Sequence, residues 1–232
     1  MQKNYKKTIN AIILITILSV IIMSLIDGVI KPGYVYKSLA KILMFLIVPI
    51  GYTYYNDSVS LKDQLKLGTK KEFFISFSLG LGVYTFILAA YFVLRSFLDL
   101  GSIIETLNKD VGVAKENFLF VALYISFINS FIEEFFFRGF LFLNLKNLGK
   151  RSFAYVFSAL AFAIYHVAIM GTWFSLPLFM LALIGLFIGG LIFNYLNSKT
   201  KNIYNSYIVH LMANFAINTV GMIMFGLLNF NL

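Results

Sequence analysis

The sequence predicts an all-α, polytopic membrane protein with about seven transmembrane helices. Its composition is the first reason, because 60% of the 232 residues are hydrophobic and only 12% are charged, whereas soluble domains average about 25% charged residues. The second reason is that the apolar residues form long runs, and a helix needs roughly 20 such residues to cross a bilayer. The third is that Lys and Arg are clustered in short segments between these runs, as in the loops of membrane proteins.

Seven hydrophobic segments are long enough to be membrane-spanning helices. They cover residues 8–26, 39–55, 72–94, 117–145, 152–170, 174–196 and 203–228. We expect the first to be a retained helix rather than a cleaved signal, because it is longer than the apolar region of a typical signal peptide and no Ala-x-Ala type site follows it. The fourth is longer than a hydrocarbon core of roughly 30 Å, so this helix must tilt, kink or project into the headgroups. The charged connections 56–71 and 95–116 predict solvated or interfacial loops.

The basic residues of the loops predict the orientation of the chain. Twelve of them lie on the side of the N-terminus and six on the other side. The six are Lys31, Lys37, Lys41, Arg95, Lys109 and Lys115. By the positive-inside rule, we expect a multi-pass protein of the cell membrane with a cytoplasmic N-terminus and an external C-terminus. Because the net charge of +9 is divided among these loops, no nucleic acid partner is expected.

Two carboxylates and a guanidinium lie inside the fourth span, where a charge costs about 2.5–3.5 kcal/mol on insertion scales and is a functional candidate by default. Glu134 and Arg138 are four residues apart with the acid first, the favourable order for a helical ion pair. Glu133 points about 100° away. Arg138 can therefore neutralise one carboxylate and leave the other for proton transfer. The alternative is a buried ionic cluster that only holds helices together.

Both His residues of the chain also lie in predicted spans. Phe162 and His166 are four residues apart, so the aromatic ring lies against the imidazole; a single His there is usually a packed core residue. His210, Asn214 and Asn218 form one stripe on the last helix, for which plain interhelical hydrogen bonding is the alternative. The occurrence of two His and two Glu residues within the spans of one chain favours a catalytic site.

The depths of these residues can be compared at 1.5 Å per residue. Counted from the inner ends of their helices, Glu133 and His166 both lie at roughly 20 Å, and His210 lies at roughly 10 Å. The three side chains meet only if the helices tilt, if the last helix begins deeper, or if the site is a cavity open to the cytoplasm.

Several known hydrolytic sites are excluded by the residues that they need. The chain has no Cys, no His-Glu-x-x-His, no Asp pair within the spans and no Gly-x-Ser-x-Gly. Glu, His and Asn side chains remain. Together they can polarise a water molecule and stabilise an oxyanion, which suffices for peptide hydrolysis.

Three motifs follow one another on separate apolar helices. They are Glu133-Glu134-x-x-x-Arg138, Phe162-x-x-x-His166 and His210-x-x-x-Asn214. This order resembles the CPBP (Abi) family, which includes CAAX prenyl proteases and bacteriocin-processing intramembrane proteases. We therefore expect motif-free transmembrane helices and loops over residues 1–116 and a catalytic helical core over residues 117–232.

The resemblance implies an intramembrane endopeptidase with a polar intramembrane cavity reached from the cytoplasmic side. In that family, the residues that correspond to Glu133 and His166 activate water, and those that correspond to His210 and Asn214 form the oxyanion site. The resemblance implies the same roles here. The supporting residues would be Glu134, Arg138 and Phe162. No cofactor is favoured. Zinc sites usually have three protein ligands that are held in place by further hydrogen bonds, whereas the two His and one Glu of this chain are spread over three helices. Since the family is also labelled as metalloprotease, zinc is the alternative, bound by Glu133, His166 and His210.

The expected partners are the lipid bilayer and a peptide or protein substrate. This substrate is either prenylated or a pheromone or bacteriocin precursor, and the 16 Lys against 3 Arg, typical of an AT-rich genome, favour the second. Two alternatives belong to other classes. One is a non-catalytic membrane scaffold for bacteriocin immunity or sensor regulation, and the other is a small transporter that uses the same polar cluster.

Overall fold

The computed structural model describes residues 2–171 and 174–228, which contain helices and no strand. Seven helices in these two ranges are long and apolar enough to cross a membrane. They are Tyr5–Ile30, Tyr34–Tyr54, Lys70–Phe97, Phe118–Asn147, Arg151–Met170, Leu176–Thr200 and Tyr204–Met224. The predicted fold class, an all-α polytopic membrane protein, is therefore confirmed, and each predicted span corresponds to one of these helices.

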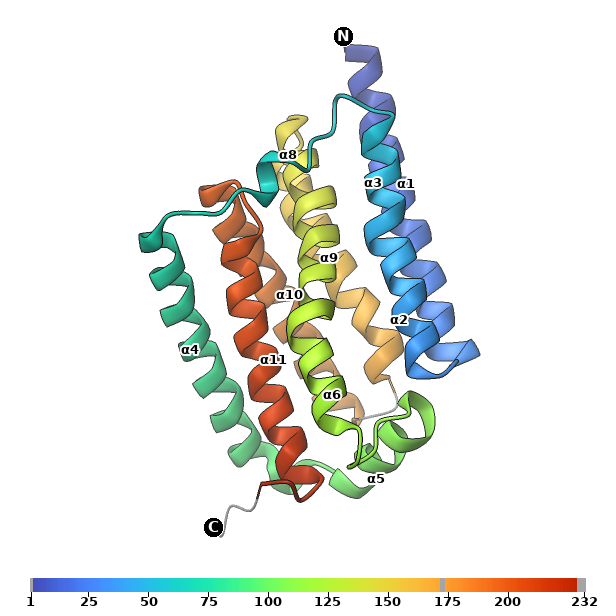
Figure 1. The fold of residues 1–232 in the computed structure, drawn as a ribbon, viewed down its shortest axis with the longest axis vertical. Coiled ribbons are helices and arrows are strands. Elements are labelled where there is room, and N and C mark those ends of the chain that lie inside the picture. Colours follow the sequence, from blue (N-terminus) through green and yellow to red (C-terminus); the bar gives the residue numbers. More distant parts are fainter. Residues whose placement is uncertain (1, 172–173, 229–232) are drawn as a thin grey trace.

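The labelled helices (Figure 1) divide into two groups. The first half of the chain forms α1 (Gln2–Leu25), α2 (Tyr34–Ile42), α3 (Val48–Tyr54), α4 (Lys70–Leu94) and α5 (Leu100–Thr106). The second half forms α6 (Phe118–Leu123), α7 (Ser130–Glu133), α8 (Asn144–Asn147), α9 (Arg151–Met170), α10 (Leu176–Thr200) and α11 (Tyr204–Met224). Two wider, π-helical segments, Tyr124–Asn129 and Glu134–Leu143, join α6, α7 and α8 into one long helix. We call this continuous helix, residues 118–147, the central helix.

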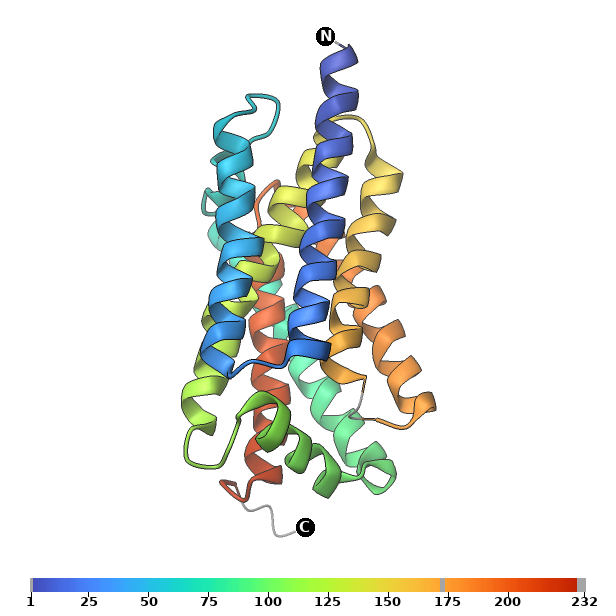
Figure 2. The ribbon, with the colours of Figure 1, turned by 90° about the vertical axis from the view of Figure 1, so that its right-hand side faces the viewer.

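The central helix forms the core of the bundle. It packs against α1, the α2–α3 span, α9, α10 and α11. Helix α4 lies at the edge of the bundle and packs on α11 (Figure 1). Figure 2 shows the central helix running obliquely across the bundle, which accommodates the excess length predicted for this span.

An aromatic cluster fixes the second span against the central helix. The ring of Phe45 stacks on Phe136 with 4.3 Å between the ring centroids, and it meets Phe137 and Tyr165 edge-on at 5.3 Å and 5.1 Å. All four side chains are buried. Such pairs contribute about 0.5–1.5 kcal/mol each beyond the area they bury. The register of the second span against the central helix and α9 is thus set by close packing.

The predicted loop assignments were wrong in two places. The second span begins at Tyr34 rather than near residue 39, so that Lys37 and Lys41 lie inside a helix and not in a loop. The connection 95–116 contains α5 and a π-helical turn, Leu107–Val111. Hydropathy misplaced the first boundary because it treats each Lys as a solvated charge, whereas Lys37 is buried and lies 3.8 Å from the carboxylate of Asp27.

The connection 56–71 is also less exposed than expected. Val59, Leu61 and Gln64 are buried in it, and its backbone is tied to the core of the bundle. The backbone N–H of Ile203 donates to the Gln64 carbonyl at 3.1 Å, which joins this loop to the start of α11. The loop therefore closes one end of the bundle.

Candidate active site

Glu133 lies near the middle of the central helix and is 1% exposed. Its two carboxylate oxygens have different surroundings. Oε1 accepts hydrogen bonds from Lys41 Nζ at 3.1 Å and from Asn129 Nδ2 at 2.9 Å. Oε2 is buried and has no hydrogen-bond partner among the described residues. Only one oxygen of this carboxylate is therefore held by the protein.

The two His residues converge on the unpaired oxygen. His166 Nε2 lies 3.9 Å and His210 Nε2 lies 3.8 Å from Glu133 Oε2. His210 thus reaches the level of the other two, although counting along straight helices placed it about 10 Å shallower. The helix ends do not share one level, and the central helix runs obliquely (Figure 2), so residue counts are a poor measure of depth in this bundle.

The other nitrogen of each imidazole is occupied. His166 Nδ1 is 2.8 Å from the Phe162 carbonyl, and His210 Nδ1 is 2.9 Å from Glu134 Oε1. A carbonyl and an ionised carboxylate only accept hydrogen bonds, so these contacts assign the hydrogen to Nδ1 in both rings. In the neutral rings, Nε2 then presents its lone pair toward Glu133 Oε2.

Glu134 is held on all sides, in contrast to its neighbour. The predicted ion pair with Arg138 is present, with 3.3 Å between Glu134 Oε1 and Arg138 Nη1, and both side chains are fully buried. Ser206 Oγ donates to Glu134 Oε2 at 2.5 Å. Since Oε1 also receives the Nδ1 hydrogen of His210, Glu134 fixes the orientation of that imidazole.

Phe162 contacts Arg138 and both imidazoles. The Arg138 guanidinium lies over the Phe162 ring at 4.1 Å and over the Phe193 ring at 4.9 Å, a cation–π arrangement. The centroid of the same Phe162 ring is 4.6 Å from that of His166 and 5.8 Å from that of His210. The predicted contact between Phe162 and His166 is confirmed, and the ring also links both imidazoles to Arg138.

Asn214 bonds to the central helix. Its Nδ2 donates to Ser130 Oγ at 2.8 Å and to the Ile125 carbonyl at 3.3 Å. One turn later, Asn218 makes the same kind of contact, with Ser126 Oγ at 2.9 Å. These are interhelical hydrogen bonds. The role of Asn214 in an oxyanion site stays a prediction.

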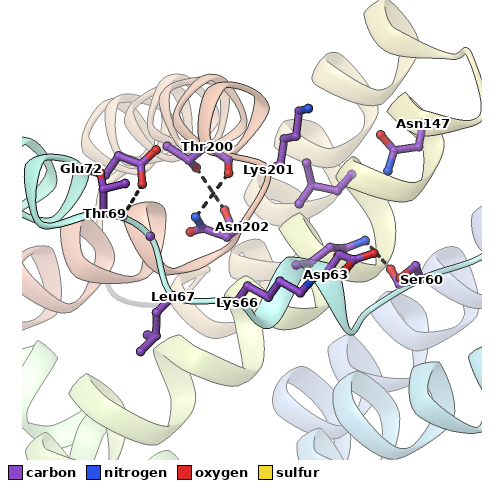
Figure 3. A pocket seen from close by; sticks show the side chains of 13 residues that line it. Ser60, Asp63, Lys66, Leu67, Thr69, Glu72, Asn147, Thr200, Lys201 and Asn202 are labelled. Carbon is purple, nitrogen blue, oxygen red and sulfur yellow. Dashed lines mark hydrogen bonds and ion pairs between the residues drawn. The ribbon is translucent and has the colours of Figure 1, made fainter.

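A cavity of about 610 Å³ lies at the end of the bundle where α4 and α11 begin (Figure 3). Figure 3 shows Thr200 and Asn202, at the turn from α10 to α11, between Thr69 at the start of α4 and Asn147 at the end of α8. The lining residues are Ser60, Asp63, Gln64, Lys66, Leu67, Gly68, Thr69, Glu72, Leu143, Asn147, Thr200, Lys201 and Asn202. In this cavity the Lys66 ammonium, 2.6 Å from Asp63, lowers the pKa of that carboxyl. None of the predicted catalytic residues lines it, so the polar intramembrane cavity around Glu133 stays a prediction.

Comparison with protein families decides the identity of the second half of the chain. Residues 115–216 match the family described as type II CAAX prenyl endopeptidase Rce1-like. These residues form an Rce1-like domain. The resemblance to the CPBP (Abi) family is thereby confirmed for this domain, whose family description indicates a peptidase, a hydrolase. Searches of curated proteins and of solved structures found no match.

The surroundings of Glu133 do not favour a resident zinc ion, and the absence of a metal stays a prediction. No group of three or more His, Cys, Asp or Glu side chains within residues 2–171 and 174–228 is arranged to hold a metal. Glu133 is also bound to the Lys41 ammonium at 3.1 Å, so a divalent cation on this carboxylate would lie beside a second positive charge. We therefore derive no step through a metal.

Sequence reasoning missed Lys41, Asn129 and Ser206. Lys41 lies in α2, outside the Rce1-like domain, and it was counted as a loop residue. The signal was nevertheless there, because position 41 falls within the predicted span 39–55. Asn129 lies four residues before Glu133, a spacing that places both on one face of a helix. Ser206 carried no signal, because Ser is common in transmembrane helices.

Proposed function

We propose that this chain is an intramembrane endopeptidase that hydrolyses a peptide bond of a membrane-associated peptide or protein. The observation that carries the proposal is the unpaired Oε2 of Glu133, which lies 3.8–3.9 Å from the Nε2 atoms of His210 and His166. These distances are too long for direct hydrogen bonds. A water molecule between Oε2 and His166 Nε2 would be within hydrogen-bond reach of both, and both atoms are bases.

In the proposed reaction, the oxygen of this water attacks the carbonyl carbon of the scissile bond. Its proton passes to Glu133, assisted by His166. When the tetrahedral intermediate collapses, Glu133 returns the proton to the leaving amine nitrogen, which breaks the C–N bond and releases an acid and an amine. Each turnover thus consumes one water molecule, and Glu133 ends ionised, as it began.

The negative charge that develops on the carbonyl oxygen needs donors. We assign these to His210 and Asn214, which share one face of α11. In the proposed reaction His210 carries protons on both ring nitrogens throughout the turnover, so that its Nε2–H donates to the oxyanion while the Glu134 carboxylate, 2.9 Å from Nδ1, balances its charge. Asn214 exchanges its bond with Ser130 for the oxyanion. Arg138 and Phe162 support this arrangement by holding Glu134 and the two rings.

For the orientation, we propose a cytoplasmic N-terminus and an external C-terminus. Helix α1 begins and α11 ends at opposite ends of the bundle (Figures 1 and 2), which is consistent with this arrangement. When only the residues outside the seven spans are counted, five basic residues lie on the side of the N-terminus and three on the other side, so the excess is smaller but keeps its sign. Reporter fusions at the two ends test this: a cytoplasmic N-terminus and an external C-terminus are expected, and two ends on one side would overturn it.

For the substrate, we propose a lipid-anchored or membrane-inserted peptide, either prenylated, as in the name of the family, or a pheromone or bacteriocin precursor. The test compares the membrane-peptide profiles of cells that express the wild-type chain, Glu133→Ala, or the matched control Glu105→Ala at an exposed position. We expect precursor peptides to accumulate only in Glu133→Ala, and their sequences identify the substrate. Identical profiles for all three chains, at equal protein levels, would overturn the proposal.

A further inference from the structure

We propose that Lys41, on a helix outside the Rce1-like domain, is a positioning residue for Glu133. By binding Oε1 and balancing the charge of the carboxylate, Lys41 keeps Oε2 as the oxygen that faces the two imidazoles. This inference rests on the proposed function, which makes Oε2 the proton acceptor. It gives the N-terminal helices a part in the active site, although they carry none of the motifs.

Three hydrogen bonds hold Lys41, Asn129 and Glu133 in a closed ring. Lys41 Nζ donates to Asn129 Oδ1 at 2.5 Å and to Glu133 Oε1 at 3.1 Å, and Asn129 Nδ2 donates to the same Oε1 at 2.9 Å. The amide of Asn129 thus uses its oxygen toward the ammonium and its nitrogen toward the carboxylate. Because both donors bind Oε1, rotation of the carboxylate away from this orientation breaks two hydrogen bonds.

The charge of Glu133 also requires Lys41. Arg138, on the central helix, is also a buried cation, but it pairs with Glu134 and lies over the Phe162 and Phe193 rings. Apart from the two imidazoles, Lys41 is the cation that lies within ion-pair distance of Glu133 in the described part of the chain. A buried carboxylate deprived of its partner is strongly destabilised. Ionised Glu133, the form that accepts a proton from water, therefore depends on this ammonium.

Lys41 is itself firmly placed. Its side chain is 12% exposed, and the ammonium lies 5.0 Å from the centroid of the Tyr165 ring, on α9. One turn later, Phe45 locks the same span against the central helix. One turn earlier, Lys37 lies 3.8 Å from Asp27, so this second ammonium has a carboxylate of its own. The two Lys residues thus pair with different acids.

The first experiment measures cleavage of a fluorogenic farnesylated peptide with a C-terminal CAAX sequence by protein in nanodiscs. The variants are Lys41→Met, which keeps the length of the side chain without its charge, and Lys41→Arg, which keeps the charge. The matched control is Lys109→Met, at an exposed position. We expect Lys41→Met to lower kcat about 100-fold or more with KM changed less than threefold, while Lys41→Arg stays within about tenfold of wild type. Wild-type kcat in Lys41→Met would overturn the proposal and leave the proposed function intact.

The second experiment needs no activity, so it distinguishes failure of this inference from failure of the proposed function. Thermal unfolding is measured for wild type, Lys41→Met, Glu133→Gln and the double variant. We expect Lys41→Met to lower Tm by about 10 °C and the double variant to regain most of this loss, because neither charge is then left without its partner. Additive losses would overturn the inference. If Lys41→Met does not fold, a folded double variant supports the inference, and an unfolded double variant contradicts it.

Discussion

Glu133 and Glu134 are neighbours on the central helix and are both buried, but they face different surroundings. On one side of the helix, Glu134 has both oxygens engaged, by Arg138, His210 and Ser206. Glu133, which points about 100° away, has one oxygen bound, and its other oxygen faces two imidazoles without a hydrogen-bond partner in the described part of the chain. A fully bonded carboxylate orients its neighbours, whereas a half-bonded one retains a lone pair for chemistry. We therefore propose a structural role for Glu134 and a reactive role for Glu133, although both are the same residue type.

The largest expected effect is on the Glu134 side. Replacing Arg138 by Met leaves a fully buried carboxylate without its cation, which costs about 3–5 kcal/mol of unfolding free energy. We expect a large loss of folded protein, measured by thermal unfolding and by the yield of monodisperse protein in detergent. The double variant Arg138→Met, Glu134→Gln is the control and should recover stability but not activity, because His210 is no longer oriented by a carboxylate. If Arg138→Met were as stable as wild type, the Glu134–Arg138 ion pair would have no structural role.

A smaller effect separates the two amides of α11. Asn214→Ala and Asn218→Ala each remove interhelical hydrogen bonds, worth on average about 0.6 kcal/mol apiece in membrane helices, so both should lower stability by about 1 kcal/mol. Only Asn214→Ala should reduce kcat, by about 10²-fold to 10³-fold, because it alone is assigned to the oxyanion. Equal activity of the two variants would show that Asn214 only joins helices.

The smallest expected effect is that of chelation. Because Glu133 is paired with Lys41 and no three-ligand set is present in the described residues, we expect extensive chelation to change peptide cleavage by less than about twofold. The zinc content of the purified active protein is measured alongside. Activity that is lost on chelation and restored by one equivalent of zinc would reassign Glu133, His166 and His210 as metal ligands.

Local features of the site were predictable from sequence. The Glu134–Arg138 pair and the contact of Phe162 with His166 follow from a spacing of four residues on one helix, which any helical model reproduces. The seven spans follow from hydropathy, and the order of the three motifs indicated the family. These features depend on residues within one helix or on the order of helices, and not on how the helices pack.

The contacts between helices were not predictable in the same way. The contact between His210 and Glu133 depends on how the helices are inclined to one another. Counting residues along straight helices gives no information on this inclination. The Lys41–Glu133 pair joins residues 92 positions apart, and hydropathy treats a Lys near a helix end as a loop residue although its charge is neutralised inside the bundle. A polar residue within an apolar run has a partner that the sequence alone does not name.

The central claim is that Glu133 activates the hydrolytic water. The most direct measurement is kcat for the farnesylated CAAX peptide, or for the precursor identified in cells, with purified wild type, Glu133→Gln and the exposed control Glu105→Gln in nanodiscs. The account predicts that kcat per folded enzyme falls by about 10²-fold to 10⁴-fold for Glu133→Gln, and by less than twofold for the control. Cleavage by folded Glu133→Gln at the wild-type rate would contradict it.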